Sequence, residues 1–148
     1  MRRLVLLKPE IVAHSTLLQL VVDRLRISGL PIQYARRIRM DAEAAAQFYK
    51  AHAGKFFYPR LVRHMTSGES VAFFLSDDVG QARATVGGGK LWPPRLRLPE
   101  GTNTDQELLI RHMFALSDVR NVAHVSDDEC ADQELAIIER LEGAEFPL

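Results

Sequence analysis

The chain has 148 residues, of which 47% are hydrophobic and 26% charged, a composition typical of one ordinary globular domain. Nineteen basic and nineteen acidic residues cancel, which disfavours a general nucleic-acid-binding protein because phosphate contacts usually need a basic excess. The single cysteine, Cys130, excludes an intrachain disulfide, and no apolar run approaches the ~20 residues of a membrane span. We therefore expect one domain over residues 1–148, with no membrane or specific nucleic-acid partner.

The first half of the chain alternates strand and helix patterns. A short apolar run, Leu4–Leu7, ends before Pro9 and is typical of a buried strand. Apolar residues then recur at helical spacing over residues 18–25, and Ser28-Gly29 is a plausible helix stop. A second strand follows over residues 32–40, where Ile32, Tyr34, Ile38 and Met40 share a parity and should share a face.

The middle of the chain continues to alternate helix and strand patterns up to about residue 86, after which no regular pattern is found. Asp41 is a good N-cap for an Ala-rich helix that reaches about His52. A short helix around residues 61–65 precedes a nearly wholly apolar strand, Val71–Leu75, and residues 79–86 are predicted to be helical. Periodicity is absent from Gly87 to about Leu109, and a loop of this length in a compact domain is usually functional or disordered.

The chain closes with a strand and a helix. The strand centres on Val122-Ala123-His124, and Ser126 followed by Glu129 is a capping-box pattern for the final helix. Without its extra helices, the order is β-α-β-β-α-β. We therefore predict an α+β, ferredoxin-like sandwich, in which a four-stranded antiparallel sheet is covered by helices on one face.

Several side chains could carry phosphate chemistry, although each alone has an ordinary structural explanation. Lys8 follows the first strand and could bind phosphate as a point charge, or be a solvated lysine. Arg83 and Arg111 flank the long loop and could clamp phosphate oxygens, or form surface ion pairs. Tyr49 and the segment Phe56-Phe57-Tyr58 could stack on a base, or belong to the core.

His124 is the strongest candidate nucleophile. It ends a strand just before a helix, where backbone N–H groups and the helix dipole favour an anion. A neutral imidazole is a competent nucleophile when an acceptor holds its other nitrogen, and Glu134 in the next helix could be that acceptor. The alternative is a structural histidine. The remaining histidines lack metal-ligand spacing, and no Walker loop is present.

Five segments together resemble the nucleoside diphosphate kinase family. The resemblance covers nearly the whole chain, and its detail is most like the divergent type 6 branch (group II). The matching segments, in order, are Leu6-Leu7-Lys8-Pro9-Glu10, residues 48–57, residues 61–68, Ile110-Arg111 and Arg120-Asn121-Val122-Ala123-His124.

The resemblance implies a function and roles for single residues. His124 would take the γ-phosphoryl group of a nucleoside triphosphate and pass it to a diphosphate in a ping-pong reaction, with Glu134 and Ser126 supporting it. The nucleotide would be held by a second set: Lys8, Tyr49 and Asn121 around ribose and phosphate, Arg83 and Arg111 on the phosphates, and Phe57 and Leu61 along the base. The resemblance also implies Mg²⁺ carried mostly by the phosphates, ATP and other nucleoside di- and triphosphates as ligands, a dimer-based homo-oligomer, and a cytoplasmic or alternatively mitochondrial location.

This sequence departs from the family pattern in four places. Val125 replaces the glycine after the histidine and could crowd the phosphate. Gly89 replaces a threonine, and Arg111-His112-Met113 replaces Arg-Gly-Asp. The loop before Arg111 carries roughly eight extra residues, around Gly101–Leu108, which would enlarge a segment that helps to form the site. The alternative reading is therefore a weak or inactive family member that acts as a nucleotide-binding or protein-interaction module.

Overall fold

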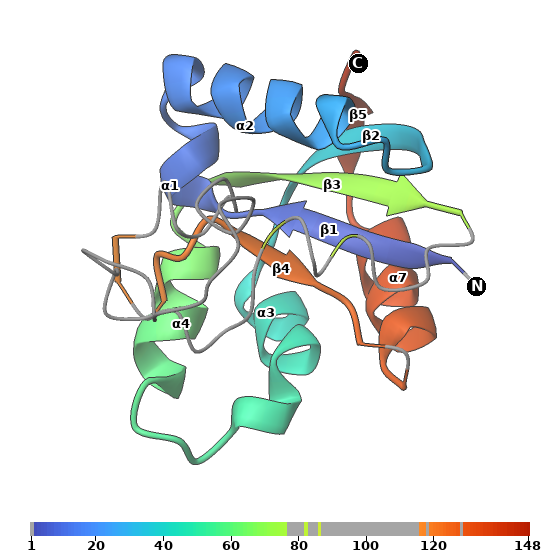
Figure 1. The fold of residues 1–148 in the computed structure, drawn as a ribbon. Coiled ribbons are helices and arrows are strands. Elements are labelled where there is room, and N and C mark those ends of the chain that lie inside the picture. The colour runs from blue at the N-terminus through green and yellow to red at the C-terminus, as the bar shows by residue number, and fades with distance from the viewer. Residues whose placement is uncertain (1, 77–81, 83–85, 87–115, 118, 128) are drawn as a thin grey trace, which may run out of the picture.

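The structure is a computed structural model that describes residues 2–76, 82, 86, 116–117, 119–127 and 129–148. Its described strands form one sheet in the order β4-β1-β3-β2-β5, and every neighbouring pair is antiparallel (Figure 1). The strands are β1 (Arg3–Leu7), β2 (Ile32–Arg39), β3 (Glu69–Leu75), β4 (Ala123–Val125) and β5 (Gly143–Glu145). The first four have the order and direction expected of a ferredoxin-like sheet, so this part of the prediction is confirmed.

The sheet has five strands rather than the predicted four, because β5 adds to the edge of β2. Its three residues are all exposed, so it has no alternating apolar pattern that could have revealed it. Gly143 pairs with Ile38, and a Cβ at this position would collide with the carbonyl oxygen of Arg37. The close approach of the two backbones therefore requires glycine at the start of β5.

Helices cover both faces of the sheet, and the prediction of a single covered face is wrong. Helices α1 (Pro9–Val12) and α2 (Ser15–Ile27) lie on one face, and α3 (Ala42–Phe48), α4 (Tyr58–Met65) and α7 (Ala131–Arg140) lie on the other (Figure 1). The cause is visible in β1, where Leu4 to Leu7 are all at most 1% exposed. Because successive strand residues point to opposite faces, an uninterrupted apolar strand needs cover on both.

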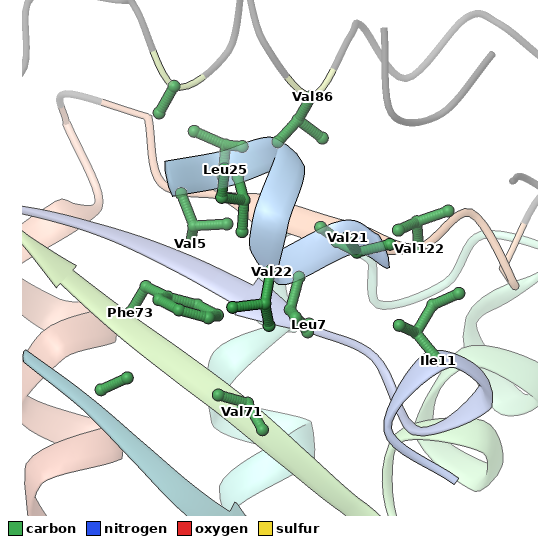
Figure 2. Packing of buried hydrophobic residues seen from close by; sticks show 14 of the residues in the cluster. Val5, Leu7, Ile11, Val21, Val22, Leu25, Val71, Phe73, Val86 and Val122 are labelled. Atoms are coloured by element: carbon green, nitrogen blue, oxygen red, sulfur yellow. The ribbon is translucent and has the colours of Figure 1, made fainter. Parts of the chain in front are cut away.

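Two apolar clusters fill the space between the sheet and its helices. The first, on the α1–α2 face, contains Val5, Leu7, Phe73 and Val125 (Figure 2 shows most of its members). The second, on the other face, contains Leu4, Leu6 and Phe74 with the buried side chains of α3, α4 and α7. The predicted common face of the second strand is wrong at Ile32, which packs on the first cluster. The reason is a register shift between Ile32 and Tyr34, where a bulge reverses the alternation.

The helix boundaries mostly follow the predicted signals. Asp41 caps α3, since its carboxylate accepts the N–H of Ala44 at 2.7 Å, and a short 3₁₀ turn, Lys50–His52, extends the segment to the predicted end. Helix α1 was not predicted. None of the helices in the described part of the chain is long and apolar enough to cross a membrane. The helix predicted for residues 79–86 and the loop predicted from Gly87 lie mostly outside the described residues.

Candidate active site

His124 is the middle residue of β4, where it pairs with Leu6 of β1. Its Nε2 lies 2.8 Å from Glu134 Oε2, and its side chain is 21% exposed. An ionised carboxylate can only accept hydrogen bonds, so the ring must carry a hydrogen on Nε2 and donate it. In the neutral imidazole, the lone pair then lies on Nδ1, which is the atom able to act as a nucleophile.

Glu134 lies near the start of α7, and its carboxylate is fixed by two donors. Besides the His124 ring, the Ser126 hydroxyl donates to the same oxygen, Oε2, at 2.9 Å, and Ser126 is fully buried. The Arg3 guanidinium in turn donates to the Ser126 carbonyl at 2.8 Å. The structure therefore brings together His124, Glu134 and Ser126, the three residues to which the resemblance gives a catalytic role.

The predicted capping box is wrong, and the reason lies in the same contacts. Helix α7 begins at Ala131 with Cys130 in the N-cap position and no side-chain cap. The Ser126 hydroxyl is directed to Glu134 instead of to a helix N–H. A Ser-x-x-Glu pattern is only a local signal, and here a tertiary contact takes the hydroxyl.

Two aromatic rings pack against the imidazole of His124. The ring centroids of Phe48 and Tyr49 lie 4.8 and 5.5 Å from that of His124, both in edge-to-face geometry. Both aromatic residues are buried, and both come from the end of α3. The resemblance places Tyr49 in the nucleotide site but gives no role to Phe48, although its position next to Tyr49 is a usable signal.

Lys8 directly follows β1 and is only 4% exposed. Its ammonium donates to the carbonyl of Val119 at 3.0 Å, and its backbone N–H donates to the carbonyl of Val122 at 2.8 Å. These contacts hold Lys8 against the segment that leads to His124. Asn121 lies in that segment, half-buried and three residues before the histidine.

His52 is a second histidine at the site, and sequence reasoning missed it. Its ring lies 5.3 Å from that of Phe57 and 6.4 Å from that of Tyr49, between two residues assigned to the nucleotide site. Burial lowers the pKa of His52 below 6.5, and the nearby basic side chains of Lys55, His124 and Lys8 lower it further, while Asp127 opposes them. His52 thus lies among the basic groups Lys8 and Lys55 on the same side of the sheet as His124. The available signal was its spacing, three residues after Tyr49 and five before Phe57.

The predicted base-binding residues lie at the start of α4. Phe57 is half-buried immediately before the helix, and Leu61 is 4% exposed within the second cluster. Phe57 also packs against that cluster. Arg83, Arg111 and the substitution Gly89 lie outside the described residues.

Val125 does not crowd the nucleophile. It pairs with Val5, is 2% exposed and packs in the first cluster, on the opposite face of the sheet from His124. Strand alternation separates the two neighbours, so the expected clash between Val125 and a bound phosphate is wrong.

The described acidic side chains do not form a metal cage. Over residues 2–76 and the described part of 116–148, no group of three or more His, Cys, Asp or Glu could hold a metal ion. Glu134, the carboxylate beside His124, is occupied by its two donors. The Glu134 carboxylate is therefore already engaged by side-chain donors at its Oε2.

Comparison with known proteins identifies the family. A family profile described as nucleoside diphosphate kinase matches residues 1–142. Nucleoside diphosphate kinase 6 of Mus musculus is 33% identical over 136 residues, covering 90% of this chain and 68% of the relative. The nucleoside diphosphate kinase of Staphylothermus marinus is 34% identical over 142 residues, covering 93% and 91%.

Solved structures agree with these sequence matches. The Aquifex aeolicus nucleoside diphosphate kinase has a TM-score of 0.75 at 27% identity, covering 93% of each chain. The Halobacterium salinarum enzyme, solved in complex with CDP, has a TM-score of 0.74 at 29% identity, covering 96% of this chain and 91% of that one. With the fold, the profile match and relatives above 30% identity in agreement, this chain belongs to the nucleoside diphosphate kinase family.

Proposed function

We propose that this chain transfers the γ-phosphate of a nucleoside triphosphate to a nucleoside diphosphate through a phosphohistidine on His124. The observation that carries the proposal is the 2.8 Å contact between His124 Nε2 and Glu134 Oε2. It fixes one nitrogen as a donor and leaves Nδ1 available for attack. The His124 side chain is 21% exposed, which leaves part of the ring accessible to a phosphate.

The proposed reaction has two matching halves. Nδ1 of His124 attacks the γ-phosphorus, the bond to the β–γ bridging oxygen breaks, and the nucleoside diphosphate leaves with that oxygen. A second diphosphate then attacks the phosphohistidine through a terminal β-oxygen, and the N–P bond breaks. Lys8 supplies positive charge beside the transferring group, and Glu134 holds the ring in the same orientation in both halves.

The nucleotide would extend away from His124 along α4. Tyr49, His52 and Phe57 form a continuous row of rings from His124 towards the start of that helix. We propose that Phe57 stacks on the base, which would tolerate different bases because each has a π-face. The family resemblance places Arg83 and Arg111 on the phosphates. Mg²⁺, when bound, would be carried by the phosphates and would neutralise part of their charge.

The test is transfer of label. We expect γ-labelled ATP with Mg²⁺ to give acid-labile label on the protein, which then passes to an added diphosphate. His124→Ala should carry no label. His14→Asn is the matched control: it changes an exposed histidine that caps α2 on the other face of the sheet, and asparagine retains the cap. It should label normally.

The same experiment separates the alternative function. A protein that binds nucleotide, measured by equilibrium dialysis, but never takes label at high enzyme concentration would be a non-catalytic nucleotide-binding module. We also propose a dimer-based homo-oligomer, as the family resemblance implies. Light scattering that gives the mass of a single 16.7 kDa chain at assay concentration would contradict it.

A further inference from the structure

The backbone just before the nucleophile has a conformation that its residue disfavours. Val122 has φ of 82° and is completely buried, and it lies two residues before His124. A β-branched residue is strained in this left-handed region, and the conformation persists only where the surrounding structure holds it. The contacts made by Val122 therefore show what determines the path of the chain into β4.

Both backbone groups of Val122 are held by the residues that follow β1. The N–H of Val122 donates to Glu10 Oε1 at 3.2 Å, and the Val122 carbonyl accepts the backbone N–H of Lys8 at 2.8 Å. Lys8 also holds the Val119 carbonyl through its ammonium. The segment 119–122 is thus fixed at three points by two side chains and one backbone group from a single short stretch of chain.

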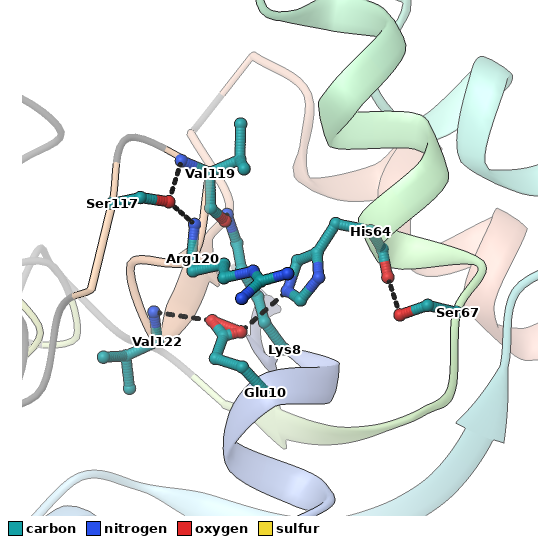
Figure 3. A network of polar contacts seen from close by, with 8 residues as sticks. All are labelled: Lys8, Glu10, His64, Ser67, Ser117, Val119, Arg120 and Val122. Carbon is teal, nitrogen blue, oxygen red and sulfur yellow. Dashed lines mark hydrogen bonds and ion pairs between the residues drawn. The ribbon is translucent and has the colours of Figure 1, made fainter.

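The second oxygen of Glu10 is held from a different element. Glu10 Oε2 lies 2.8 Å from Nε2 of His64, in the last turn of α4, and the two side chains are only 8% and 10% exposed (Figure 3). His64 therefore fixes the carboxylate that fixes Val122. The contact links α4, which begins beside Phe57, to the backbone that carries Asn121 and His124.

The surroundings of the pair are cationic and partly open. A cavity of about 480 Å³ lies beside it, and its described lining includes His64 and three arginines, Arg60, Arg63 and Arg120. A buried carboxylate costs less free energy beside these positive charges and near water than in a closed apolar site. These surroundings suit a side chain that accepts hydrogen bonds on both of its carboxylate oxygens.

We propose that Glu10 and His64 are positioning residues that hold Val122 in its left-handed conformation, so that Asn121 and His124 keep the relative placement required for phosphate transfer. This inference rests on the proposed role of His124. Neither residue touches the reacting atoms, and each acts through the backbone of Val122. Glu10 must supply an acceptor for the Val122 N–H, and His64 must supply a donor to the Glu10 carboxylate.

The test compares conservative and disruptive substitutions. Glu10→Leu leaves the buried Val122 N–H without its acceptor, and we expect the single-turnover labelling rate at saturating ATP, per folded protein, to fall at least about 10-fold. Glu10→Gln keeps an acceptor and should retain most of the rate. His64→Leu should lower the rate and His64→Gln, which keeps an N–H donor, should restore it. Glu139→Gln, which removes the charge from the exposed pair with Arg2, is the control for loss of a charge.

A second comparison removes the strain itself. Glycine adopts positive φ readily, so in a Val122→Gly background the Glu10→Leu substitution should cost several-fold less in rate than in the parent chain. An equal cost in both backgrounds would overturn the proposal. So would a Glu10→Leu protein that is folded and labels as fast as the parent, or a Glu10→Gln protein as slow as Glu10→Leu.

A measurement without catalysis keeps this test separate from the proposed function. The ¹⁵N shifts of the His124 ring report which nitrogen carries the hydrogen and how the ring is held. They should change in Glu10→Leu and remain in Glu10→Gln. If the parent protein takes no label, the proposed reaction fails, whereas unchanged His124 shifts in Glu10→Leu would contradict the positioning role by itself.

Discussion

The two faces of the sheet at β4 differ in chemistry although they are built from consecutive residues. Ala123 and Val125 belong to the apolar cluster under α1 and α2. His124, between them, meets Glu134, Phe48 and Tyr49 on the opposite face. One face thus contributes stability and the other presents reactive groups, and the alternation of a three-residue strand separates the two functions. Substitutions at neighbouring positions should therefore give different phenotypes.

The largest expected effect on stability comes from placing a charge on the apolar face. Val125→Asp puts a carboxylate into the first cluster, where an uncompensated buried charge typically costs about 3–5 kcal/mol. His124→Asn changes the adjacent, partly exposed residue and should cost about 1 kcal/mol while abolishing labelling. Urea denaturation of both variants measures the difference. Equal losses of stability in the two variants would contradict the assignment of Val125, but not His124, to the stabilising apolar face.

The next largest expected effect is on the labelling rate, and it comes from changing Glu134 on the face of the sheet that carries His124. Glu134→Gln preserves the size of the side chain and an acceptor for His124, but removes the negative charge. Because a hydrogen bond to a charged group contributes about 1–1.5 kcal/mol more than one to a neutral group, we expect the labelling rate to fall about 5- to 13-fold with little change in unfolding free energy. Ser126→Ala removes the other donor to the same oxygen, and should have a smaller effect of the same kind. Single-turnover labelling measures both, and a normal rate in Glu134→Gln would contradict the role of its charge.

A milder change on the apolar face tests whether Val125 affects the chemistry. Val125→Ala removes two buried methyl groups and should lower the unfolding free energy by about 1.5–2 kcal/mol. The labelling rate per folded protein should not change, because Val125 faces away from His124. A faster rate in Val125→Ala would indicate that this residue does restrain the phosphate.

The smallest expected effect is the pH dependence contributed by His52. Its folded pKa is lowered from 6.5, so the unfolded chain binds a proton first as pH falls. The contribution of neutral His52 to the free energy of unfolding is therefore fully present above pH 6.5. It is lost progressively as the pH falls below 6.5 towards the lowered pKa of His52 in the folded protein. His52→Gln should flatten this part of the stability profile. An NMR titration of the parent should show the His52 pKa rising when a nucleoside triphosphate binds, because the phosphates offset the neighbouring positive charges.

The sequence predicted the order of the elements because apolar periodicity and helix caps are local properties. Residues 4–7 and 71–75 could only be buried strands, and Asp41 marks the start of α3 where the structure has it. The same local signals failed where a distant partner intervened. Ser126 resembles a helix cap but serves Glu134, and Gly143 begins a strand that only the neighbouring β2 makes possible.

The sequence by itself determined the fold plan, the family resemblance and the identity of the candidate reactive residues, since these depend on residue type and spacing along the chain. Only the tertiary structure decided which atoms meet. It turned Val125 away from the reactive face, put His52 beside Tyr49 and Phe57, and joined Glu10 to His64 across 54 positions. The physical reason is that packing between distant segments decides which helices cover each side of an alternating strand and holds the strained backbone of Val122. No local sequence pattern encodes such packing.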